Sequence, residues 1–195
     1  MTAITKAGEG NPTARPMGDR GMTLWFTGLP SAGKSTIAEC VMRRLHAQGV
    51  RSETLDGDDL RRNLTRDLGF SRADREENVR RIGYVARILA AHGVVTLVPV
   101  IAPYAADRSD VRAQHEDTGV DFAEVYVTAP VDVCRSRDVK GLYAKQRDGH
   151  LTGLTGVDDP YEPPTRPDLR IDTQDQTIDR SVDTVYDFLT RRLAS

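Results

Sequence analysis

Hydrophobic positions along the chain alternate between short apolar runs and longer stretches in which they recur with helical spacing. In residues 34–48, apolar side chains such as Ile37 and Val41 return every three or four positions, which predicts an amphipathic helix ended by Gly49. Residues 94–101 are apolar on both faces, as in a central strand of a parallel sheet. The same patterns predict further strands at residues 22–27, 52–55, 122–127 and 169–171, and further helices at 72–92 and 178–193.

Strands that alternate with helices predict βαβ units, and therefore an α/β fold with a mostly parallel central sheet and helices on both faces. Ser71 and Asp74 form a capping-box pattern at the start of the longest predicted helix. Residues 139–167 are dense in glycine, proline and charged residues, and a loop of this length is typical of a functional lid. Residues 1–21 lack an apolar run, so we expect a flexible tail ahead of one domain, residues 22–195.

The composition argues against several classes of protein. A net charge of −2 over 195 residues does not favour a dedicated nucleic-acid binder. The two cysteines, Cys40 and Cys134, are far apart and form no C-x-x-C pair, so neither a disulfide framework nor a zinc site is expected. No segment reaches the length of a membrane span or has the pattern of a secretory signal. We therefore expect a cytoplasmic protein without a nucleic-acid or membrane partner.

The segment from Gly28 to Ser35, GLPSAGKS, matches the phosphate-binding pattern G-x-x-x-x-G-K-[ST]. A chance match in a loop is the alternative, but this one follows a predicted strand and opens a predicted helix, as the motif requires. Backbone N–H groups of such a loop can surround phosphate oxygens, Lys34 can reach the β- and γ-phosphates of ATP, and the Ser35 hydroxyl can join a Mg²⁺ shell. The predicted ATP-binding residues of this loop are Gly28, Ser31, Ala32, Gly33, Lys34, Ser35 and Thr36.

An acidic cluster, Asp56, Asp58 and Asp59, follows the second predicted strand. In a doubly wound sheet this cluster would lie beside the phosphate-binding loop, at the carboxyl edge where ligands bind. A carboxylate there can accept a proton from an attacking hydroxyl or hold metal-bound water. The alternative is a polar turn that caps the next helix, which stays open for Asp59, whereas chemistry is favoured for Asp58. No N-K-x-D motif is present, so a kinase is favoured over a GTPase.

Arginines are dense between residues 61 and 81. Arg75 stands one helical turn from Asn78, so the two share a face, and arginine suits bidentate contact with sulfate or phosphate oxygens. A solvated helix face is the alternative for part of this segment. After the fourth strand, Arg135 and Arg137 are candidates for contact with the ATP adenine, unless both are ordinary arginines of a helix surface.

Several motifs in order along the chain resemble the adenylylsulfate (APS) kinase family, in particular its bacterial branch. They are the loop 28–36, LDGDDLR at 55–61, LGFS at 68–71, IAPY at 101–104, KGLY at 140–143 and GLTGVDDPYE at 153–162. The resemblance covers about residues 22–189 and implies a P-loop nucleoside-triphosphate kinase fold with a lid. It also implies transfer of the γ-phosphate of MgATP to the ribose 3′-hydroxyl of adenosine 5′-phosphosulfate, by a homodimer that can be coupled to ATP sulfurylase.

The resemblance further assigns roles to individual residues. Asp58 would be the base or the partner of a metal-bound water, and Phe70 would stack on the adenine of APS. Lys140, on the lid, would add positive charge near the transferring phosphoryl group, as Lys34 does from the loop. The implied catalytic residues are Lys34, Asp58 and Lys140, and the implied substrate-binding residues are Asp56, Asp58, Arg61, Phe70, Arg75, Asn78, Ile101, Lys140 and Leu154.

Four positions depart from the family pattern. Asp59 stands where many members have Asn, so we expect its side chain to point away from an anionic substrate. Ala102 replaces a Ser that carries phosphate in some members, which predicts direct in-line transfer. Ala105 replaces a frequent Arg, and Leu154 replaces a frequent Phe with loss of aromatic contact. Leu154 and Ala105 therefore keep open a relative that phosphorylates another nucleotide or natural-product hydroxyl. A non-catalytic nucleotide-binding partner is a further alternative, against which the complete phosphate-binding loop and Asp58 argue.

Overall fold

The computed structural model describes residues 20–194, so nearly all of the predicted tail, residues 1–21, lies outside the described residues. A five-stranded sheet with every neighbouring pair parallel forms the centre, in the order β2-β3-β1-β4-β5. The strands are β1 Met22–Thr27, β2 Ser52–Thr54, β3 Val95–Pro99, β4 Asp121–Thr128 and β5 Leu169–Asp172. The helices are α1 Lys34–Ala47, α2 Gly57–Arg62, α3 Arg72–Ala91, α4 Ala105–Glu116, α5 Val131–Arg137, α6 Leu142–Arg147 and α7 Ile178–Ala194. The predicted α/β fold is confirmed.

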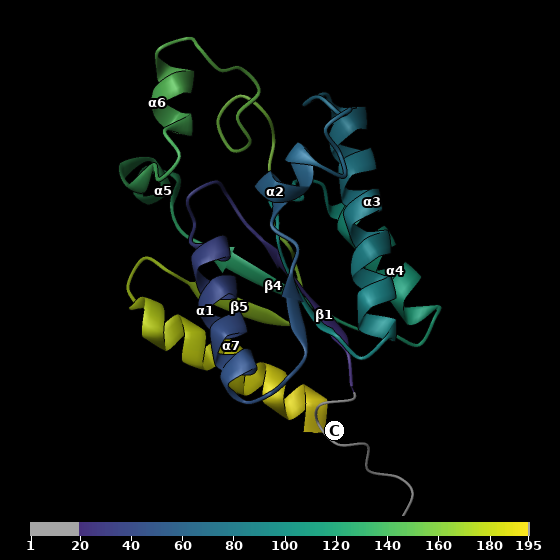
Figure 1. The fold of residues 1–195 in the computed structure, drawn as a ribbon. Coiled ribbons are helices and arrows are strands. Elements are labelled where there is room, and N and C mark those ends of the chain that lie inside the picture. The colour runs from purple at the N-terminus through teal and green to yellow at the C-terminus, as the bar shows by residue number, and fades with distance from the viewer. Residues whose placement is uncertain (1–19, 195) are drawn as a thin grey trace, which may run out of the picture.

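Helices cover both faces of the sheet, as Figure 1 shows. Helices α1 and α7 pack together on one face, and α3 and α4 pack on the other. The short helices α2, α5 and α6 gather beyond the carboxyl ends of the strands. This is the edge at which ligands bind in open α/β sheets.

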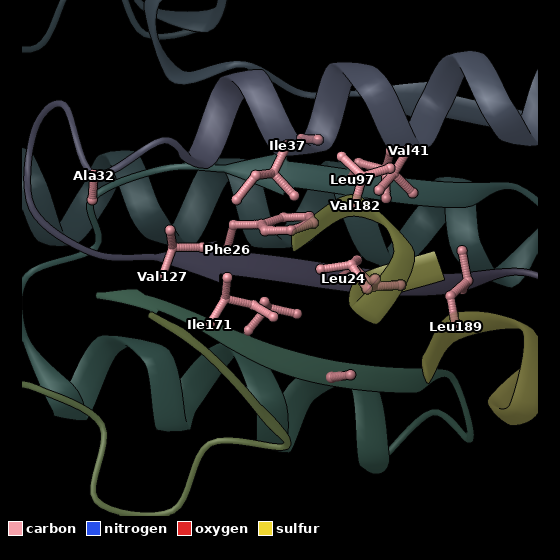
Figure 2. Close-up of a cluster of buried hydrophobic side chains, with 14 of the residues drawn as sticks. Leu24, Phe26, Ala32, Ile37, Val41, Leu97, Val127, Ile171, Val182 and Leu189 are labelled. Carbon is pink, nitrogen blue, oxygen red and sulfur yellow. The ribbon is translucent and has the colours of Figure 1, made fainter. Parts of the chain in front are cut away.

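The sheet divides the buried side chains into two hydrophobic cores. Successive residues of a strand point to opposite faces, so Leu24 and Phe26 of β1 enter one core while Trp25 enters the other. The larger core lies under α1 and α7 and contains Ile37 and Leu189 (Figure 2). The smaller core, under α3 and α4, joins Trp25 to residues that follow β3. Each core therefore supports a different part of the carboxyl edge.

All five predicted strands and all three predicted helices are present, with ends that shift by only a few residues. The capping box at the start of α3 is confirmed, because the Ser71 hydroxyl and the Asp74 carboxylate each accept from the other residue's backbone N–H. The predicted lid, residues 139–167, contains the helix α6. Within residues 20–194, no helix is both long enough and apolar enough to cross a membrane.

Helix α4 was not predicted, because its inward face is largely polar. Its buried residues are Arg108, Val111 and His115, which leave no apolar repeat to detect. His115, in the last turn of α4, is fully buried and contacts the Thr23 hydroxyl at 3.0 Å. Burial lowers the pKa of His115. Helix α4 approaches α3 so closely that a Cβ at Gly83 would lie 2.7 Å from the Val111 side chain.

Candidate active site

The phosphate-binding loop connects β1 to α1 and needs its glycines for backbone geometry. Gly28 and Gly33 have φ values of 152° and 104°, in the region that side chains other than hydrogen disfavour. A Cβ at Gly28 would lie 2.1 Å from the carbonyl oxygen of Val127 in the neighbouring strand. The tight turn places the N-terminus of α1, with its free N–H groups and partial positive charge, at the mouth of the loop.

Lys34 is the first residue of α1, and its side chain folds back across the loop. Its Nζ atom donates to the carbonyl oxygens of Gly28 at 2.9 Å and Leu29 at 2.8 Å. The residue is only 7% exposed, and this burial lowers its pKa from 10.5 to about 8. A buried ammonium with so little compensation favours an anion beside it.

Asp56 links the phosphate-binding loop to the acidic cluster. It is the N-cap of α2, where its carboxylate accepts from the backbone N–H of Asp58 at 2.9 Å. The same carboxylate accepts from the Ser35 hydroxyl at 2.8 Å. Asp56 therefore caps the next helix, as the alternative predicts. The same carboxylate also lies beside the Ser35 hydroxyl, so two oxygen atoms of different residues come together. Oxygen donors of this kind suit Mg²⁺, which takes one or two protein ligands and completes its shell with phosphate and water.

A cleft of about 550 Å³ runs along the carboxyl edge, from the phosphate-binding loop to the start of α3. One of its walls is the segment 99–103, directly after β3, which we call the acceptor wall. Most of the predicted site residues line this single cleft: Ser31, Ala32, Gly33, Lys34, Ser35, Thr36, Asp56, Asp58, Arg61, Phe70, Arg75, Asn78, Ile101, Arg137 and Lys140.

Arg61 and Phe70 face each other at the acceptor end of the cleft. The Arg61 guanidinium lies 4.5 Å from the centre of the Phe70 ring and donates to the carbonyl oxygen of Gly69 at 2.9 Å. The Phe70 ring is 62% exposed, although it is a large apolar group. An exposed ring beside a fixed guanidinium is suited to stack on a planar base.

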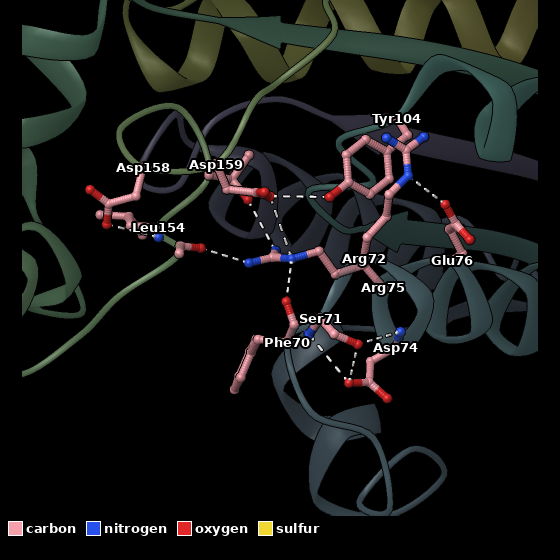
Figure 3. A network of polar contacts seen from close by, with 12 residues as sticks. Phe70, Ser71, Arg72, Asp74, Arg75, Glu76, Tyr104, Leu154, Asp158 and Asp159 are labelled. Carbon is pink, nitrogen blue, oxygen red and sulfur yellow. Dashed lines mark hydrogen bonds and ion pairs between the residues drawn. The ribbon is translucent and has the colours of Figure 1, made fainter.

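Arg75, on the first turn of α3, has a partner at each of its three guanidinium nitrogens (Figure 3). Its Nε donates to the carbonyl oxygen of Phe70 at 3.0 Å, and its Nη2 donates to that of Gly153 at 2.7 Å. Its Nη1 donates to the Thr155 hydroxyl at 3.0 Å, and Asp159 lies 3.6 Å away. Arg75 therefore borders the cleft and also fastens α3 to the later part of the lid.

The lid reaches the catalytic candidates at two points. Lys140 forms an ion pair with Asp58 across the cleft. The Tyr143 hydroxyl, on α6, donates to the carbonyl oxygen of Pro30 in the phosphate-binding loop at 3.2 Å. Asp138 fixes the start of this lid segment, because its carboxylate accepts from the backbone N–H groups of Tyr143 and Ala144 at 3.1 and 2.9 Å. The lid thus contacts both the donor loop and the acidic cluster.

Some predicted residues lie elsewhere. Leu154 is buried in the larger core and does not line the cleft, because its side chain packs inward from the lid. Arg135 is exposed on α5 and pairs with Asp132 at 3.0 Å, as the helix-surface alternative describes. Gly28 also lies outside the lining, beneath Lys34. Asp59 points away from the cleft as expected and pairs with Arg62 at 3.0 Å.

Other residues of the lining were missed by sequence reasoning. Thr173, Gln176, Ile178 and Ser181 line the cleft from the end of β5 and the start of α7. Thr173 accepts from Arg137 Nη1 at 2.9 Å, which links the two sides of the donor end. Their position after a parallel strand was the available signal, since ligands bind beyond the carboxyl ends of such strands.

Comparison with known proteins shows similarity over most of this arrangement. A family model described as adenylylsulphate kinase matches residues 20–172. An adenylyl-sulfate kinase of Synechococcus sp. (strain JA-3-3Ab) is 56% identical over 148 residues, which cover 76% of this chain and 82% of that protein. The solved structure of an APS kinase from Mycobacterium tuberculosis, in complex with AMPPNP and APS, is 49% identical with a TM-score of 0.84. The match covers 87% of this chain and 98% of the M. tuberculosis chain.

A hexameric APS kinase from Thiobacillus denitrificans is also similar, at 37% identity and a TM-score of 0.69. It covers 92% of this chain, and the match spans 30% of that longer chain. The similarity includes both ends of the cleft, from the phosphate-binding loop to the arginines of α3.

Proposed function

This chain belongs to the adenylyl-sulfate kinase family of ATP-dependent phosphotransferases, and we propose that its cleft transfers the γ-phosphate of ATP to the ribose 3′-hydroxyl of adenosine 5′-phosphosulfate. The products are 3′-phosphoadenylyl sulfate and ADP. One observation carries the proposal: the phosphate-binding loop and the cluster around Phe70 and Arg75 line the same cleft, with Asp58 between them. A donor and an acceptor bound at its two ends would meet beside that carboxylate.

At the donor end, the loop amides and the N-terminus of α1 bind the phosphates of ATP. Lys34 contacts the β- and γ-phosphates, and their negative charge stabilises the protonated amine that burial disfavours. Arg137 and Ile178 are placed to hold the adenine, one by its guanidinium and the other by an exposed apolar side chain.

Mg²⁺ fits the oxygen atoms that Ser35 and Asp56 bring together. Ser35 would contribute its hydroxyl to the metal, and Asp56 and Asp58 would accept hydrogen bonds from water bound to it. Bound Mg²⁺ supplies Lewis-acid stabilisation of the transferring phosphoryl group. Phosphate oxygens and water would complete the shell of a metal held there.

At the acceptor end, Arg61, Arg75 and Asn78 bind the phosphosulfate and ribose, and Phe70 stacks on the adenine. The 3′-oxygen attacks the γ-phosphorus in line, and its proton passes to the Asp58 carboxylate. The new O3′–P bond forms as the bond between the γ-phosphorus and the bridging oxygen breaks, and ADP leaves with the electron pair. Transfer is direct, since Ala102 has no hydroxyl to carry phosphate.

The ion pair between Lys140 and Asp58 implies an exchange of partners during this reaction. When both substrates are bound, the Lys140 ammonium moves to the transferring phosphoryl oxygens, and Asp58 becomes free to accept the proton. Closure of the lid also excludes water, which limits wasteful hydrolysis of ATP. The catalytic residues of this proposal are Lys34, Asp58 and Lys140.

A homodimer is the proposed assembly. A relative is described as hexameric, so oligomers occur among similar chains. Light scattering after size-exclusion chromatography measures the mass of this protein, and a mass of one chain at micromolar concentration would reject the dimer.

The function is tested by ADP release with a panel of acceptors, combined with mass spectrometry of the product. We expect turnover with adenosine 5′-phosphosulfate and a product heavier by one phosphate, located on the 3′-oxygen by the coupling of its phosphorus to the ribose 3′-proton in the NMR spectrum. Other nucleotides and sugar alcohols serve as alternative acceptors. Lys34→Ala is the control, because it removes the lysine of the donor loop and should abolish all turnover. Turnover with another acceptor, and none above the ATPase background with adenosine 5′-phosphosulfate, would overturn the proposal.

A further inference from the structure

Arg108 is a buried residue of α4. It does not line the cleft, but it contacts the acceptor wall from the side that faces away from the cleft. It is 4% exposed, and each of its guanidinium nitrogens has a partner. Nη1 donates to the carbonyl oxygen of Ala102, Nη2 donates to that of Glu162, and Nε donates to the Glu124 carboxylate, all at 2.7 Å. The three partners come from the acceptor wall, from the end of the lid and from β4.

The contact with Ala102 holds an unfavourable backbone conformation. Ala102 has a φ of 42°, in the left-handed region that alanine rarely adopts. Such a residue keeps its conformation only when the surrounding structure fixes it. The carbonyl oxygen of the preceding residue, Ile101, accepts from the Thr27 hydroxyl at 2.6 Å, and that of Ala102 accepts from Arg108. These two carbonyls of the acceptor wall are therefore fixed from behind.

The contact with Glu162 joins the same wall to the lid. The backbone N–H of Glu162 donates to the carbonyl oxygen of Pro103 at 2.9 Å, and its carboxylate accepts from the backbone N–H of Ala105 at 2.7 Å. Close by, the Tyr104 hydroxyl donates to Asp159 at 3.3 Å (Figure 3). The end of the lid, residues 159–162, therefore lies along the acceptor wall, and Arg108 bonds to both.

We propose that Arg108 is a positioning residue for the acceptor: it sets the acceptor wall and the end of the lid against the sheet, and so determines how tightly the acceptor binds. The inference rests on the proposed function, because it assigns this end of the cleft to the acceptor. Arginine suits the role, since its rigid fork can hold two carbonyl oxygens while its charge is balanced by Glu124. A lysine would keep the charge but would lose this fixed geometry.

The first test is Arg108→Lys, assayed with each substrate varied in turn. We expect KM for adenosine 5′-phosphosulfate to rise by about 10- to 100-fold, because small displacements of a binding wall have effects of this size. KM for ATP should change by less than about twofold, because no contact of Arg108 reaches the donor loop. A variant that is merely less stable would lose kcat through its unfolded fraction and would keep both KM values.

Arg112→Lys is the matched control. Arg112 is the next arginine of α4, half-buried, and it pairs with Asp168 at 2.5 Å without contacting the acceptor wall. We expect the control to leave both KM values near those of the unaltered protein. A rise in the acceptor KM of this control equal to that of Arg108→Lys would show that any disturbance of α4 has the effect, and would overturn the inference.

A second variant keeps the test decisive if Arg108→Lys does not fold. The pair Arg108→Met with Glu124→Gln removes both charges together, so that no buried carboxylate is left unpaired. We expect this protein to fold, with a urea midpoint lowered only by the loss of the donor to the carbonyl oxygens of Ala102 and Glu162, and still to show the raised acceptor KM. If the folded variant had a normal acceptor KM, Arg108 would act through stability alone and the inference would be wrong.

The unaltered protein separates this inference from the proposed function. Without turnover of adenosine 5′-phosphosulfate by the unaltered protein, the proposed function fails. With that turnover present, and with the acceptor KM unchanged in both Arg108 variants, the proposed function stands and the positioning role of Arg108 is refuted.

Discussion

Replacing Lys34 with methionine should change the free energy of unfolding of the nucleotide-free protein by an amount that depends on pH. Methionine has a similar length and no charge, so it removes the buried ammonium and keeps most of the packing. The pKa of Lys34 falls from 10.5 to about 8 in the folded protein because the amine is buried. Holding this amine protonated at neutral pH therefore costs the folded state about 3 kcal/mol.

The sign of the pH effect follows from the two protonation states. Between about pH 8 and pH 10.5 the unfolded chain binds more protons at Lys34 than the folded protein does, so the free energy of unfolding rises with pH. From about pH 7 to about pH 9.5 this contribution amounts to about 2 kcal/mol. Lys34→Met lacks it, so the stability of the variant relative to the unaltered protein should fall by that amount over the same range.

The hydrogen bonds lost in the substitution do not depend on pH in this way. The carbonyl oxygens of Gly28 and Leu29 lose their donor, at a cost of about 1 kcal/mol each, which shifts the difference by a constant. Burial raises the pKa of the Cys134 thiol and the lysine ammonium opposes this rise, so the loss of that charge acts in the same direction as the main effect. Burial raises the pKa of Tyr143 and of Tyr161, which weakens the folded state at high pH in both proteins and cancels in the comparison.

The assay is urea unfolding in the absence of nucleotide, followed by the fluorescence of Trp25, the only tryptophan of the chain. Lys145→Met is the control, because Lys145 is exposed on α6 and its loss should leave the difference independent of pH. A difference between Lys34→Met and the unaltered protein that stays constant from about pH 7 to about pH 9.5 would refute the reasoning.

Three further substitutions probe the site and the fold. Asp58→Asn should lower kcat by about 10²- to 10⁴-fold with little change in KM for ATP, because the substitution removes a proton acceptor. Steady-state ADP release measures both constants, and unchanged turnover would remove Asp58 from the mechanism. Phe70→Ala should raise KM for adenosine 5′-phosphosulfate by about tenfold through loss of stacking, whereas an effect on ATP instead would place the ring at the donor end. Gly83→Ala should lower the free energy of unfolding by about 1–3 kcal/mol because its Cβ would meet Val111, and urea unfolding midpoints measure this directly. An undisturbed midpoint would show that α3 and α4 can separate at little cost.

Much of the fold was predictable because local signals agreed with it. Apolar runs and helical repeats located all five strands and the helices α1, α3 and α7, and the capping box located the start of α3 to the residue. Helix α4 was missed because burial there is achieved by Arg108 and His115, whose partners come from distant parts of the chain. Hydrophobic periodicity contains no information about such pairs.

The site was predictable where a short motif determines the geometry, as in the phosphate-binding loop. The prediction that Leu154 lines the cleft is wrong because the conformation of a long lid determines which of its side chains face the cleft, and Leu154 faces the larger core instead. Gln176 and Ile178 show a second failure, because their only signal is a place in the sheet order. Positions set by chain topology become visible only when the strands are arranged in space.

The division of the interior by the sheet has a consequence for how such an enzyme can change over generations. The donor loop rests on the core beneath α1 through Ala32 and Ile37, whereas the acceptor wall rests on the opposite core through Val100 and Ala102. Mutations that reshape one core leave the packing behind the other loop intact. Selection can therefore alter which hydroxyl is presented for phosphorylation without rebuilding the machinery that holds ATP, and new acceptors can arise on an inherited donor site.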